Sequence, residues 1–175
     1  MARVFISFAT EDQPVAEAVK REIENRLTLR GQVFMTSDRD QLVAGEDWFA
    51  RIKKEIGLSE VVVLMLSRRG VARPWVNFEA GAAWLADKSL IPVCYGAMSI
   101  NALPRPYSNF HALSLPEQAD FLVESVAKHL GLAKPASTLF KKLRAVMDPD
   151  YKPGILEIVE KAHSIETAVA LFQDQ

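Results

Sequence analysis

One acidic side chain stands out by its place in the sequence. Glu79 lies four residues after Trp75, so the two side chains share one face of a helix that begins near Trp75. Glu79 is then about one turn into that helix, close to the end of the strand before it. Four small residues follow, Ala80-Gly81-Ala82-Ala83, which let neighbouring backbone approach closely. On these residues alone, the simpler interpretation is a solvated helix carboxylate. The functional alternative is an acid placed in a crevice.

Other patterns that carry chemistry are missing from the sequence. The three histidines are far apart and have no metal-ligand spacing, and Cys94 is the only cysteine. No Gly-x-Gly-x-x-Gly follows a strand, and no Gly-Lys-Ser/Thr of the Walker type is present. The sequence therefore predicts no metal site and no resident dinucleotide cofactor.

Composition narrows the class of protein. Lys and Arg number 21 against 22 Asp and Glu, so the chain lacks the overall basic excess of many nucleic-acid binders. A hydrophobic content of 49% excludes wholesale disorder. No apolar stretch approaches the roughly 18–20 residues that span a bilayer, and the first apolar segment is too short for a signal peptide. We expect a cytoplasmic protein with no direct nucleic-acid partner and no membrane partner.

Short apolar runs alternate with amphipathic stretches over residues 1–133. The runs predict strands at residues 4–8, 33–35, 61–66, 90–93 and 111–115. The amphipathic stretches predict helices at residues 10–27, 48–56, 75–86 and 116–130. This alternation predicts an α/β domain with a five-stranded parallel sheet and helices on both faces. A ligand crevice is then expected beyond the carboxyl ends of the strands.

Two local details add to this prediction. Thr10 and Gln13 have the spacing of a capping box, which predicts a helix that begins at Thr10. Pro92 cannot donate a ladder hydrogen bond, so it should lie at a sheet edge or near the end of its strand.

Residues 134–175 have a different character, with Pro135, Pro149 and Pro153-Gly154 breaking the chain. Apolar residues from Ile155 to Phe172 recur at spacings of three and four, which predicts an amphipathic helix over 155–172. The segment is interpreted as a C-terminal helical extension or the start of a linker to another domain. Its helix either packs on its own domain or offers a docking surface to another domain or chain.

Several motifs together resemble a known family. They are Val4-Phe5-Ile6-Ser7-Phe8 with Glu11-Asp12, Asp38 through Leu42-Val43-Ala44-Gly45, Ser59 before Val61–Leu66, Ser67 after it, Trp75 with Glu79, and Ile91-Pro92-Val93. In this order and spacing they resemble a Toll/interleukin-1 receptor (TIR) domain of the bacterial kind, over roughly residues 3–131.

The resemblance implies a flavodoxin-like fold and, as in many bacterial members, cleavage of NAD at the nicotinamide–ribose bond. NAD is then a substrate and not a cofactor. The family's catalytic glutamate matches Glu79. One acid is chemically sufficient, because the nicotinamide of NAD is already a cationic leaving group, whereas ordinary glycosidases need a second carboxyl group to protonate a leaving oxygen. The remaining task is to stabilise a ribosyl cation, which a nearby carboxylate does electrostatically. Water attack gives ADP-ribose, and internal attack gives a cyclic form.

The resemblance also suggests further site residues. Phe8 and Ala9 would form the floor of the pocket, and Ser67 would form a hydrogen bond to a ribose or phosphate. Trp75 is either part of the core or part of the pocket wall. Asp38 and Arg39 lie in the 36–47 loop, which the family uses as a mobile lid and assembly surface.

Three functions stay open at this point. The first is an NAD glycohydrolase or cyclase activated by self-assembly through the 36–47 loop, in bacterial antiviral defence signalling. The second is a non-catalytic adaptor that only binds other TIR domains. The third is a nucleoside deoxyribosyltransferase-like enzyme, which has a similar sheet and a glutamate in a related sequence.

Overall fold

The computed structural model describes residues 3–35 and 47–136. Within these residues a parallel sheet contains β1 (Val4–Ser7), β2 (Val33–Met35), β3 (Val61–Leu66), β4 (Ser89–Cys94) and β5 (Leu113–Ser114). The helices are α1 (Gln13–Leu27), α2 (Trp48–Leu58), α3 (Pro74–Leu85) and α4 (Ala119–His129). The 36–47 loop up to residue 46, with Asp38 and Arg39, and the 155–172 helix lie outside the described residues.

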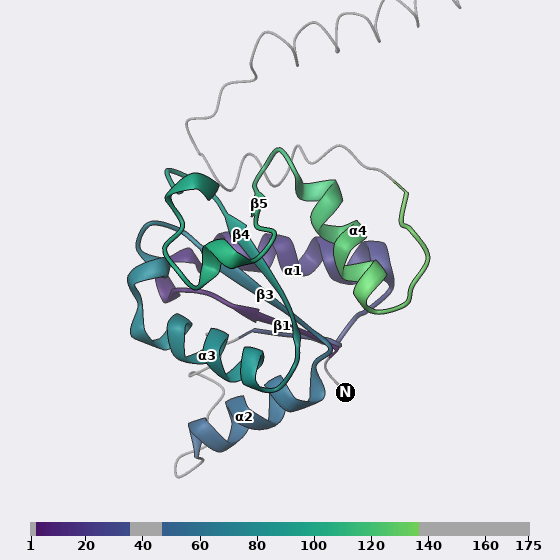
Figure 1. The fold of residues 1–175 in the computed structure, drawn as a ribbon. Coiled ribbons are helices and arrows are strands. Elements are labelled where there is room, and N and C mark those ends of the chain that lie inside the picture. Colours follow the sequence, from purple (N-terminus) through teal and green to yellow (C-terminus); the bar gives the residue numbers. More distant parts are fainter. Residues whose placement is uncertain (1–2, 36–46, 137–175) are drawn as a thin grey trace, which may run out of the picture.

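The strand order is β2-β1-β3-β4-β5, and every pairing is parallel (Figure 1). This is the flavodoxin-like order, so the predicted fold class is confirmed. The chain runs outward from β1 to β2, then crosses to β3 on the other side of β1. The order of strands therefore reverses between β1 and β3, and a ligand crevice is expected at the carboxyl ends of these two strands.

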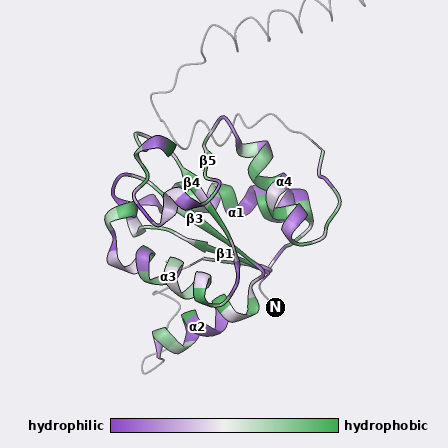
Figure 2. Ribbon diagram, viewed as in Figure 1, coloured by the Kyte–Doolittle hydropathy of each residue, from purple (hydrophilic) through white to green (hydrophobic). Residues whose placement is uncertain are grey.

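Two apolar cores lie on the two faces of the sheet. Helices α1 and α4 pack on one face, against side chains such as Ile6 and Val63. Helices α2 and α3 pack on the other, against Phe5 and Leu64. The alternation of neighbouring residues between faces follows from the pleat of a strand. Strand β3 is buried at all six positions, which explains its unbroken apolar sequence (Figure 2).

The predicted capping box is wrong. Thr10 begins a short 3-10 turn, η1 (Thr10–Asp12), and α1 begins only at Gln13, with no side-chain cap from Asp12. The carboxylate of Asp12 instead accepts a hydrogen bond from Ser67 Oγ, 2.7 Å away. This hydrogen bond between the segments that follow β1 and β3 is found in place of the predicted helix cap.

The fifth strand is shorter than predicted, and the helix after it begins later. Ser114 bonds through both its backbone N–H and its C=O to Gln118, which turns the chain away from β4. Pro116 lies in that turn, and α4 begins at Ala119.

Pro92 lies inside the sheet, yet it removes no bond between β3 and β4. Ser89 N–H donates to Glu60 on the β3 side, whereas Cys94 C=O accepts from Leu115 on the β5 side. Backbone groups alternate along a strand, so Pro92 faces the β5 side. Strand β5 pairs only with Val93 and Cys94. The prediction of an edge position therefore holds locally.

Candidate active site

The carboxyl group of Glu79 is fully buried, although it belongs to a helix on the outside of the sheet. Glu79 lies in the second turn of α3, on the side that faces the strands. Ser7 Oγ donates a hydrogen bond to Glu79 Oε2 at 2.5 Å. Ser7 is the last residue of β1 and is itself fully buried. The carboxyl group therefore lies at the carboxyl end of β1, where the strand order reverses.

The environment of Glu79 opposes its charged form. Burial raises the pKa of Glu79 from 4.5 to about 8, and the hydrogen bond from Ser7 limits this rise. The indole of Trp75 also lowers the pKa of Glu79, by less than Ser7 does, although it makes no hydrogen bond of good geometry to Glu79. Oε1 has no hydrogen-bond partner within residues 3–35 and 47–136. At neutral pH most molecules hold this carboxyl group protonated, with one oxygen unused.

Four aromatic side chains, Trp48, Phe49, Trp75 and Phe78, form a cluster between α2 and α3. Trp75 stacks on Trp48 at 6.5 Å and on Phe78 at 5.4 Å between ring centroids. Phe49 contacts Trp75 edge-on at 5.3 Å. Trp75 is half-buried, so it is both part of this cluster and a wall beside Glu79 one turn along the helix.

The other predicted site residues are placed less directly. Phe8 is buried in the core on the side of α1 and α4, which is the opposite face of the sheet from Glu79. Ala9 is also buried. Ser67 Oγ donates to Asp12 Oδ2 and accepts a hydrogen bond from Gly70 N–H at 2.9 Å, so its hydroxyl has a structural role in this structure. Substrate contact by these residues stays a prediction.

Sequence reasoning did not select Ser7 as a site residue. It is the single polar residue in the buried strand Val4–Ser7, and that is the signal that could have identified it. A hydroxyl buried at the end of a core strand needs a partner, and its partner here is the candidate catalytic acid.

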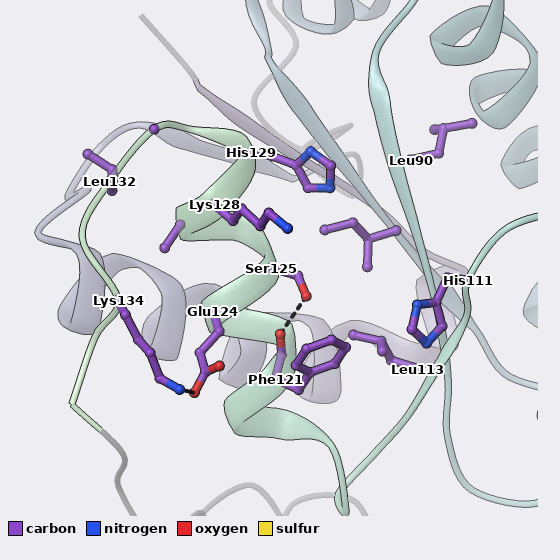
Figure 3. A pocket seen from close by; sticks show the side chains of 13 residues that line it. Leu90, His111, Leu113, Phe121, Glu124, Ser125, Lys128, His129, Leu132 and Lys134 are labelled. Carbon is purple, nitrogen blue, oxygen red and sulfur yellow. Dashed lines mark hydrogen bonds and ion pairs between the residues drawn. The ribbon is translucent and has the colours of Figure 1, made fainter.

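A cavity of about 720 Å³ lies away from Glu79, between α4 and the β4–β5 side of the sheet (Figure 3). Leu90, Ile91, Leu113 and Phe121 give it apolar walls. Lys128, His111 and His129 also line it, and Lys134 pairs with Glu124 at 3.1 Å. Glu79 does not line this cavity, so its size is no argument about the chemistry of Glu79.

The described residues contain neither a cluster of metal ligands nor a helix that could cross a membrane. In residues 3–35 and 47–136, no three His, Cys, Asp or Glu side chains are grouped to hold a metal ion. In the same residues, every helix is too short or too polar to cross a membrane.

Comparison with known proteins gives a family match and a shared fold. The TIR domain family matches residues 4–130. A metazoan TIR-STING receptor from C. gigas superimposes with a TM-score of 0.56 at 20% identity, over 79% of this chain and 42% of the receptor. The same receptor in complex with 2',3'-cGAMP gives a TM-score of 0.54 at 23% identity, over 78% of this chain and 41% of the receptor.

A third structure, the TIR domains of the activated Roq1 resistosome recognizing XopQ, gives a TM-score of 0.45 at 20% identity, over 76% and 86% of the two chains. No curated protein matches the chain. The chain spans about two fifths of the length of the C. gigas receptor.

Proposed function

Because the chain belongs to the TIR domain family through residues 4–130, we propose that it cleaves NAD at the nicotinamide–ribose bond, with Glu79 as the catalytic residue. One observation supports this most strongly. Glu79 is fully buried at the carboxyl end of β1, and its Oε1 is without a partner among the described residues. Burial of an acid with an unused oxygen costs stability, and such a cost is typical of a functional site.

The electrostatics of Glu79 suit a cationic substrate. The nicotinamide ring of NAD carries a positive charge, and a positive charge beside a carboxyl group favours its ionised form. Binding of NAD would therefore release the proton that Glu79 holds in the free protein. The carboxylate formed in this way stabilises positive charge that develops on the ribose as the C1'–N bond breaks and its electron pair moves to the nicotinamide nitrogen.

Water completes the reaction in the hydrolytic branch. Its oxygen bonds to C1', and one of its protons is lost. The products are nicotinamide, ADP-ribose and a proton. Glu79 can accept this proton, because the pKa of Glu79 in the free protein is about 8, close to the value that suits a base at neutral pH. In the cyclising branch an atom of the same ADP-ribosyl group attacks C1' in place of water.

Self-association through the 36–47 loop would control this activity, with bacterial antiviral defence signalling as its setting. Asp38 and Arg39 belong to that loop, and Ala9, Ser67 and Trp75 are the proposed contacts for the rest of the substrate. If the competent form needs a neighbouring chain, a dilute monomer is expected to be nearly inactive.

The test is nicotinamide release from NAD, followed by chromatography across a wide range of protein concentration and with a crowding agent. Glu79→Gln keeps the size of the side chain but cannot ionise, and it should lower the rate at least about 100-fold. Glu117→Gln, a change of the same kind at an exposed position, should leave the rate unchanged.

Release that persists in Glu79→Gln would remove this residue from the mechanism. Absence of release under every assembling condition would favour the adaptor function. Base exchange on deoxynucleosides, without NAD cleavage, would favour the deoxyribosyltransferase-like enzyme.

A further inference from the structure

A second cavity, of about 460 Å³, lies on the α3 face of the sheet. Its walls come from α3, from β3 and β4, and from the chain around the 3-10 turn η5 (Tyr107–Asn109). We call it the α3–η5 cavity. Its volume is within the range of about 300–1,000 Å³ that holds small molecules. Glu79 is not among its lining residues.

The residues that line the α3–η5 cavity are all uncharged among those described: Leu64, Asn77, Ala80, Gly81, Trp84, Leu90, Pro106, Tyr107, Asn109 and Phe110. A charged group placed inside it would lose its hydration without gaining an opposite charge, which is costly. An anion or a cation is therefore a poor occupant.

Aromatic side chains make up a large part of the wall. Tyr107 is almost fully buried, whereas Trp84 is 63% exposed. A tryptophan this exposed leaves a flat apolar ring in contact with water, which a planar ligand would cover. Rings stacked or packed edge-on gain about 0.5–1.5 kcal/mol beyond the burial of their surface.

The polar side chains that line the cavity are Asn77, Tyr107 and Asn109. Tyr107 Oη donates to Asn77 Oδ1 at 2.6 Å, and Asn77 Nδ2 is held by Arg73 C=O at 2.9 Å. Asn77 is thus occupied, while the phenolic oxygen of Tyr107 keeps a lone pair. Exposed Asn109 offers one donor group and one acceptor.

Gly81 is a glycine in the interior of α3 that lines the cavity. Glycine inside a helix costs roughly 0.5–1 kcal/mol relative to alanine. A Cβ at this position would meet no atom within 4 Å, so packing against the described residues does not require glycine. Gly81 places no side chain in the cavity.

We propose that the α3–η5 cavity binds an uncharged heteroaromatic molecule of nucleobase or pyridine-carboxamide size. Its ring lies between Trp84 and Gly81, and its polar edge reaches Tyr107 Oη and Asn109. This site is separate from the carboxyl group of Glu79, and its existence does not depend on NAD cleavage.

The experiment is a calorimetric titration of the full 175-residue chain with matched probes. Nicotinamide and nicotinate have the same shape but differ in charge, and adenine represents the nucleobases. We expect nicotinamide to bind at least tenfold more tightly than nicotinate. Whichever of nicotinamide and adenine binds more tightly identifies the class of ligand: pyridine carboxamides or nucleobases. Equal binding of nicotinamide and nicotinate, or no binding of either uncharged probe, would overturn it.

Variants locate the binding. Gly81→Leu places a side chain in the cavity, and Trp84→Ala removes an aromatic wall, so each should weaken binding at least tenfold. Leu85→Ala, on the same helix and 79% exposed but outside the lining, should bind as the natural chain does. Loss of binding in Glu79→Gln, with binding kept in Gly81→Leu and Trp84→Ala, would move the ligand to the active site and refute the separate site.

Discussion

Glu79 couples stability to pH at the scale of a single residue. In the unfolded chain this carboxyl group loses its proton near pH 4.5, whereas in the fold it keeps the proton until about pH 8. Between these two values the unfolded state binds fewer protons than the folded state, so the free energy of unfolding falls as pH rises. Below about pH 4.5 both states are protonated and no loss occurs. Above about pH 8 the loss is complete, at about 5 kcal/mol.

Glu79→Gln should remove this pH dependence, because glutamine does not ionise. The variant is expected to gain stability relative to the natural chain by several kcal/mol between pH 5 and pH 8. Urea unfolding at pH 5 and at pH 8 gives the difference in the free energy of unfolding between the two proteins at each pH. The contributions of the other titrating groups cancel in this difference, because both proteins contain them. An unchanged difference would mean that Glu79 is not protonated in the fold at neutral pH.

The sequence could indicate Glu79 but not its environment. Its spacing from Trp75 and the resemblance to a family directed attention to this residue. In the fold it is buried and accepts a hydrogen bond from Ser7, which lies 72 residues earlier in the chain. No local pattern predicts a contact over that distance, because the strand order that creates it is a property of the assembled sheet.

Elements of the fold differ in how well the sequence predicts them. The bounds of β2 and β3 were predicted correctly, because an apolar run ends where a buried strand ends. The bounds of β5 and the start of α1 were not. In those places backbone or carboxylate groups bond to Gln118 and Ser67, and such contacts between segments override local propensity.

The bond between Ser67 and Asp12 ties η1 to the connection between β3 and α3, the helix that carries Glu79. Ser67→Ala leaves a partly buried carboxylate and the Gly70 N–H without this partner, and we expect a loss of about 1–3 kcal/mol in the free energy of unfolding. Denaturant unfolding measures it.

Ser125→Ala is the matched control for Ser67→Ala. Ser125 Oγ donates to the Phe121 C=O of its own helix and is half-buried, and alanine favours a helix, so the free energy of unfolding of this variant should change little. If Ser67→Ala weakened substrate binding with no loss of stability, Ser67 would be a substrate contact, as the resemblance suggests, and its structural role would be refuted.

For the molecule as a whole, the described core extends close to the last described residue. Leu130 is buried in the core beside α1 and α4, Leu132 packs against it, and Arg26 donates to Ala136 C=O at 2.7 Å. Residues 137–175 lie outside the described part of the chain, so the structure does not test the predicted domain boundary near residue 133.

A chain that ends at residue 136 should therefore fold on its own. We expect cooperative urea unfolding with a midpoint close to that of the full chain, because the described core of the sheet and its four helices is kept. A large fall in the midpoint would show that residues 137–175 belong to the same folding unit.

The short β5 leaves the first part of β4, Ser89–Pro92, without a strand neighbour on that side within the described chain. Unpaired strand backbone usually invites a foreign strand and, with it, aggregation, but Ile91 and Pro92 are buried here. Pro92 faces that side and has no N–H to offer, so an intruding strand would find an incomplete ladder. Addition of a strand from another copy is therefore disfavoured at this edge of β4.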